Sequence, residues 1–176
     1  MSFLLLKELE KLLESGFSKT VFRVPEKEPG DYIPPQFFIG AIPPKRKKND
    51  PDYQEQSDFP FIVNRFWDGE DTEDDSLAVI RTICGIYTAG NVTSGEQDII
   101  NMVFRCRRLI LEKAMLDDRY ELVLPLKWSF GDVDDRHGQP HPFYGGVLVS
   151  RWRIPGVERI LQPEKEIEIY GSGIKE

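Results

Sequence analysis

Five side chains that could bind a divalent cation lie close together in residues 131–142. They include both histidines of the chain, and they are Asp132, Asp134, Asp135, His137 and His141. Carboxylates and imidazoles are common metal ligands, but this spacing fits no known ligand template. Glycine and proline in the same segment favour a turn-rich connection. We therefore expect a loop without a metal ion, and a small metal-dependent enzyme built on Asp132–His141 remains an alternative.

A second acidic segment, residues 68–75, carries six carboxylates that could offer oxygens to calcium. They are Asp68, Glu70, Asp71, Glu73, Asp74 and Asp75. Gly69 stands in the wrong place for an EF-hand, so we expect a charged surface here. Cys84 and Cys106 have apolar neighbours and lie in no nucleophile motif, which favours buried thiols in a reducing compartment. We expect no catalytic residue and no cofactor.

The charge of the chain is uneven as well as negative. Its net charge of −7 argues against specific or general nucleic-acid binding, which relies on a surplus of basic residues. A basic cluster lies apart from the acidic segment in the sequence. Opposite charges on different edges could steer neighbouring subunits. We therefore expect an interface that includes Lys45, Arg46, Lys47, Lys48, Glu70, Asp71, Asp74 and Asp75.

The size and composition indicate one folded domain over residues 1–176. Hydrophobic residues make up 40% and charged residues 30%, which is typical of a globular protein. Within it we expect a proline-rich arm with a long charged loop at residues 25–58 and a C-terminal tail at residues 162–176. The apolar run at residues 3–6 is too short to cross a bilayer and resembles no export signal. We expect no membrane contact.

Helical spacing of apolar residues appears twice. Residues 3–15 should form a short N-terminal helix that Gly16 stops. Residues 94–115 should form a long amphipathic helix that begins at a capping box made by Ser94 and Gln97. Its inner face repeats every three or four residues, through Ile99, Val103, Cys106, Ile110 and Ala114.

Strand patterns predict an α+β fold. They occupy residues 36–42, 59–66, 78–87, 120–130 and 143–154, and the last four form two hairpins, the first with a wide, charged tip. We expect a mostly antiparallel, four- to six-stranded sheet, with the long helix packed across it. The large aromatic residues Trp128, Tyr144 and Trp152 are expected in the core. Val147 and Val149 make the opposite face of the last strand apolar, which indicates that a partner subunit covers it.

Several short segments resemble one family of viral structural proteins. Between residues 59 and 155 the order of elements and the aromatic and proline signatures are similar to small tail-completion proteins of long-tailed phages and prophages, particularly tail terminators. The segments are Phe59-Pro60-Phe61-Ile62-Val63-Asn64-Arg65, Leu124-Pro125-Leu126-Lys127-Trp128 and His141-Pro142-Phe143-Tyr144-Gly145-Gly146, with the strand at residues 79–87 and a helix beginning near Asp98.

The resemblance implies a virion component made in the host cytoplasm and assembled into the tail. Such a protein forms a homo-oligomeric ring, with a hexamer as one option, that ends growth of the tail tube and contacts the tail-tube protein and the head connector. No catalytic residue comes with it. The long proline-rich segment, residues 25–51, keeps a head-completion or other minor tail role open as an alternative. A host regulatory or adaptor domain is a third option.

Overall fold

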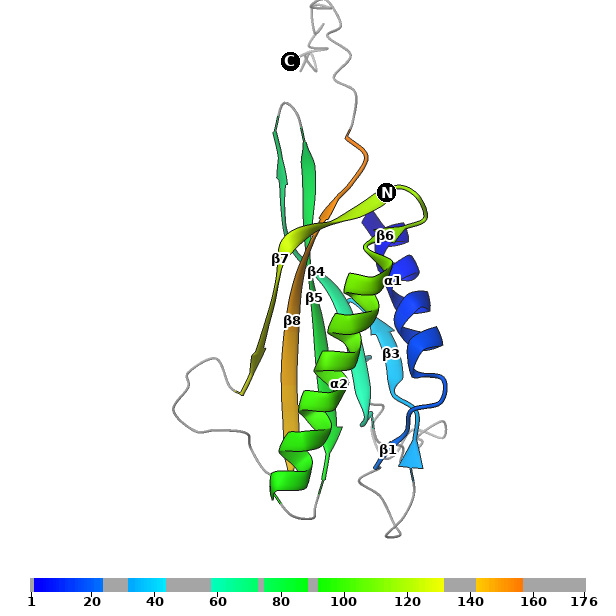
Figure 1. Ribbon diagram of the computed structural model, residues 1–176, viewed down its shortest axis with the longest axis vertical. Helices are drawn as coiled ribbons and strands as arrows, with labels where there is room; N and C mark the ends of the chain where they lie inside the picture. Colours follow the sequence, from blue (N-terminus) through cyan, green and yellow to red (C-terminus); the bar gives the residue numbers. More distant parts are fainter. Residues whose placement is uncertain are drawn as a thin grey trace, which may run out of the picture.

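Two helices pack on one face of a curved six-stranded sheet in the computed structural model (Figure 1). The structure describes residues 2–23, 32–43, 58–72, 75–88, 92–131 and 142–156. In chain order the elements are α1 (Ser2–Phe17), β1 (Phe22–Arg23), β2 (Tyr32–Ile33), β3 (Gln36–Ile39), β4 (Phe61–Asp71), β5 (Ser76–Tyr87), α2 (Val92–Lys113), β6 (Met115–Leu116), β7 (Tyr120–Phe130) and β8 (Phe143–Arg153). The predicted α+β fold is confirmed.

The strand order of the large sheet is β3-β4-β5-β8-β7-β6, and only β3 and β4 are parallel. A separate antiparallel pair is formed by β1 and β2. The strand β8 lies between β5 and β7, where it joins the two predicted hairpins into one sheet. Its burial alternates along the strand because every second side chain faces the helices.

The tip of the β4–β5 hairpin is narrower than the sequence predicts. Pairing continues to the partners Asp71 and Ser76, so Asp68, Glu70 and Asp71 belong to β4 and not to a wide loop. This end of β4 is exposed, and charged side chains can extend into water while the backbone keeps its ladder bonds to β5. The acidic end of β4 therefore forms an exposed edge of the sheet, while β8 pairs with the other side of β5 as far as Leu77.

The helix α2 supplies much of the core, as predicted, but its ends differ from the prediction. It begins at Val92, so Ser94 lies inside the first turn and is not the N-terminal cap. It ends at Lys113, because Ala114 adopts a positive φ of 48° that stops the helical ladder. Its buried face carries Ile99, Met102, Val103, Cys106 and Ile110.

A tight turn at Asp117 and Asp118 joins β6 to β7. Both residues have φ of 50°, and the Arg119 N–H donates to the Leu116 carbonyl at 3.0 Å. Positive φ at both central positions is the mark of a type I′ turn, whose twist matches that of paired strands, and aspartate tolerates this conformation. The edge strand β6, which the sequence did not predict, results from this turn.

The glycine expected to stop the first helix instead lies within it. Gly16 belongs to α1, and a Cβ atom there would lie 2.2 Å from a methyl carbon of Leu109 on α2. The missing side chain lets the two helices approach closely. Arg105 of α2 donates two hydrogen bonds to the Gly16 carbonyl, at 3.0 and 2.7 Å, which satisfies a carbonyl of the last helical turn.

Two of the three aromatic residues expected in the core are there, and the third is not. Tyr144 and Trp152 are buried, whereas Trp128 is 42% exposed. Trp128 lies on the helix side of β7, where Phe104, with ring centroids 5.8 Å apart, and the Arg107 guanidinium, 5.0 Å from the ring centroid, cover it only in part. The alternation of side chains along a strand indicates which face of the sheet Trp128 lies on, but not how deeply it is buried.

Both cysteines lie in the core, where β5 meets α2. The sulfur atoms of Cys84 and Cys106 are 3.9 Å apart, and both side chains are fully buried. Burial raises the pKa of the Cys106 thiol, and its hydrogen bond with Cys84 raises it further. A raised pKa reduces the thiolate, which is the reactive form, at every pH.

We therefore expect the native protein to resist thiol reagents. At pH 8 a colorimetric aromatic disulfide should label neither cysteine, whereas in concentrated urea it should label both. The absorbance of the released thiolate measures this directly. Labelling of the native protein at the rate of a small free thiol would contradict the buried position of the pair.

Candidate functional site

The face of the sheet opposite the helices carries an apolar surface. Ile83, Val147 and Val149 on it are half-buried, and no helix covers it within the part of the chain that the structure describes. At its β4 side the Arg81 guanidinium lies 3.2 Å from the centroid of the Trp67 ring, an arrangement that favours a cation–π contact. The second face is therefore apolar around Ile83 and Val147, as the sequence indicated, and it carries Arg65, Arg81 and Arg151 beside them.

The acidic hairpin tip, which we define as Asp68, Glu70 and Asp71 on β4, gathers exposed carboxylates at one end of the molecule (Figure 1). Glu70 and Asp71 were predicted interface residues, and the structure places both here. Asp74, another, lies outside the described residues. The strand β3 pairs only with Phe61–Asn64 of β4, so no described strand pairs with the outer edge of β4 near the tip.

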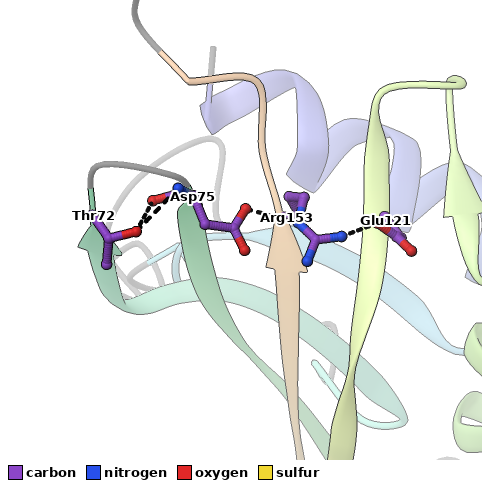
Figure 2. Close-up of polar contacts among 4 residues, drawn as sticks. All are labelled: Thr72, Asp75, Glu121 and Arg153. Carbon is purple, nitrogen blue, oxygen red and sulfur yellow. Dashed lines mark hydrogen bonds and ion pairs between the residues drawn. The ribbon is translucent and has the colours of Figure 1, made fainter.

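The turn end of this hairpin is fixed by polar contacts that connect Thr72 and Asp75 to β8 and β7 (Figure 2). The Thr72 N–H donates to the Asp75 carbonyl at 2.7 Å, and the Asp75 N–H donates to the Thr72 hydroxyl at 3.0 Å. Arg153 of β8 then donates to the Asp75 carboxylate at 2.7 Å and also to Glu121 of β7. Asp75, a predicted interface residue, therefore has its carboxylate in an internal ion pair.

An open pocket of about 520 Å³ lies between the β1–β2 pair and α2. We call it the arginine groove, and its lining includes Val21, Arg23, Tyr32, Asp98, Arg105 and Arg108. Sequence reasoning missed it, because the arginines of α2 were interpreted as a polar outer face and Arg23 is distant in the chain. The signal was present only as a basic stretch on the helix.

The arginines of the groove differ in how firmly they are held. Two of the N–H groups of Arg105 bond to the Gly16 carbonyl, and its guanidinium carbon lies 5.4 Å from the centroid of the Phe17 ring. Arg108 forms an exposed ion pair with Glu112 at 3.2 Å, a type of pair that contributes little to stability. Burial raises the pKa of Asp98, so this wall is partly withheld from water.

The remaining predicted sites fall outside the described residues. These are the basic cluster Lys45, Arg46, Lys47 and Lys48 and the loop with Asp132, Asp134, Asp135, His137 and His141. Residues 162–176 and most of the arm at residues 25–58 also lie outside the described residues. Within the arm, the described part includes β2 and β3. Among the residues that are described, no group of three or more acidic, histidine or cysteine side chains could hold a metal ion.

No helix among the described residues is both long and apolar enough to cross a membrane. In comparisons with known proteins, the chain matches no protein-family model and no curated protein.

Proposed function

We propose that the protein is a structural virion component of a long-tailed phage or prophage, and not an enzyme. In this role it is a tail terminator or tail-completion protein that forms a ring at the end of the tail tube and joins the tube to the head connector. A head-completion or other minor tail protein is the alternative role. The segments that resemble this family provide the starting point.

The observation that carries the proposal is the exposed acidic hairpin tip, together with a basic groove at another place on the same molecule. Unlike surfaces on different parts of one subunit favour head-to-tail contacts, and such contacts close into rings when the rotation between subunits allows it. The apolar sheet face around Ile83 and Val147 offers a further surface of the kind that protein partners cover.

The charge of the chain also fits a ring through which DNA passes. With a net charge of −7, carboxylates that face the lumen repel phosphates, whereas a basic lining would bind them with release of counterions. The genome can then pass without adhering. After assembly in the host cytoplasm, the protein would remain in the tail of the virion.

The direct test is addition of the purified protein to tail tubes of the phage or prophage that carries its gene. Negative-stain electron microscopy should show rings on one end of the tubes, and further tube protein should no longer lengthen them. Binding should weaken as salt rises from about 0.05 to 0.5 M, since exposed charges are screened beyond about 8 Å at physiological ionic strength.

Two results would count against this function. One is a protein that leaves tube ends bare and tube growth unchanged at every salt concentration. The other is a gene neighbourhood without tail-tube or capsid genes, which would favour a host adaptor instead. Rings at the head vertex in place of the tube end would support the head-completion alternative.

A further inference from the structure

We propose that the acidic hairpin tip of one subunit docks in the arginine groove of a second copy of this chain. The inference deepens the proposed ring and rests on it, because it names the two surfaces that join neighbouring subunits. The first observation is that the two surfaces carry opposite charges. Arg23, Arg105 and Arg108 line the groove with one carboxylate, Asp98, whereas the tip presents three carboxylates.

The positions of the tip and the groove indicate a contact between two copies of the chain and not within one. The acidic tip lies at one end of the long axis, whereas β1, which lines the groove together with the middle turns of α2, lies toward the other end (Figure 1). The tip therefore cannot reach the groove of its own chain. A contact between unlike surfaces of two copies is heterologous, so each subunit can accept one neighbour and enter another.

The tip is built to enter a recess without rearrangement. The strands stay paired up to Asp71 and Ser76, and the Thr72–Asp75 hydrogen bonds close the hairpin at its turn. Arg153 of β8, which pairs with Leu77 of β5, ties this turn to β8 and to Glu121 of β7 (Figure 2). A projection that is already ordered loses little conformational freedom when it binds.

The groove is similarly prepared for carboxylates. A guanidinium has five N–H donors. The Nε and one Nη nitrogen of Arg105 each donate one hydrogen bond to the Gly16 carbonyl, which orients the guanidinium and leaves its other N–H groups available to a carboxylate. Arg108 can exchange its exposed partner Glu112 for a carboxylate of the neighbour at small cost. The partly withheld wall at Asp98 strengthens charge interactions there relative to open water.

Cross-linking of the full chain tests the contact even if it is weak in solution. Glu70→Cys and Val21→Cys place one thiol on the tip and one in the exposed rim of the groove, while the native cysteines are buried. A short bismaleimide should then produce a ladder of dimers, trimers and larger species on a denaturing gel. The matched control, Glu70→Cys with Lys127→Cys, places the second thiol on β7 and should give only a faint dimer band.

Charge reversal in the Glu70→Cys, Val21→Cys variant distinguishes this contact from cross-linking by random collision. Arg23→Glu with Arg108→Glu should reduce the ladder to the control level, and so should Asp68→Lys with Asp71→Lys. All four changes together should restore it, which a loss of folding could not do. Circular dichroism of each variant checks the fold.

The inference is overturned if the tip-and-groove pair cross-links no better than the control, or if the fourfold reversal fails to restore the ladder while every variant is folded. Its failure differs from that of the proposed function. Capped tail tubes without a ladder would remove this contact alone. A ladder from a protein that ignores tail tubes would keep the contact and remove the tail role.

Discussion

Val103→Asp should abolish cooperative folding of the protein. The Val103 side chain is fully buried on α2 and faces β8, where it would lie 2.6 Å from a Cβ atom placed on Gly146. An ionised carboxylate buried without a partner costs several kcal/mol, and the stability of a whole domain is only about 5–15 kcal/mol. Thermal unfolding followed by far-ultraviolet circular dichroism should show no native transition.

The same substitution at an exposed position of the same helix is the control. Ile100 is 39% exposed, so Ile100→Asp places its carboxylate in water and should change the free energy of unfolding by no more than about 0.5 kcal/mol. Similar melting of the two variants would mean that α2 does not pack on the sheet through Val103.

The second large effect is expected at a glycine pair of β8. Gly146→Ala should destabilise the protein by about 1–3 kcal/mol, because its new methyl group meets Val103 and the Phe130 ring, at 2.6 and 3.2 Å. Valine has little freedom of rotation on a helix and cannot move aside easily. Urea denaturation measures the difference in unfolding free energy.

The neighbouring glycine supplies the control because it faces the other side of the sheet. A Cβ atom on Gly145 would come no closer than 3.8 Å to the Cys84 carbonyl oxygen, an ordinary contact. Gly145→Ala should therefore leave stability within about 0.5 kcal/mol of the native protein. Equal losses at both positions would show that the contact with Val103 does not determine the effect.

Local patterns were sufficient to predict most of the fold. The strand predicted at residues 143–154 matches β8 to within one residue, because alternate burial leaves a period of two in the sequence. The strand predicted at residues 120–130 matches β7, although its burial does not alternate regularly. The charged end of β4 has no such period, since backbone bonds to β5 hold it. The two-residue strand β6 was also missed, because a turn at Asp117 and Asp118 creates it.

The candidate surfaces were predicted only in part, for a different reason. The carboxylates of the acidic tip are close in sequence, so their clustering was visible before any fold was known. The arginine groove joins Arg23 of β1 to Arg105 and Arg108 of α2, which lie in distant parts of the chain. Such a site depends on tertiary packing, which a local pattern does not contain.

The central position of β8 sets the order of events during synthesis. The ribosome makes β5 and β7 before β8, yet each of them takes one of its two partner strands from β8. Until residues 143–153 emerge, the facing edges of β5 and β7 are unpaired and Val103 of α2 has no β8 to pack against, a state exposed to association with other chains. Completion of the core therefore follows translation of β8, so a chaperone that shields the earlier strands would act during this interval.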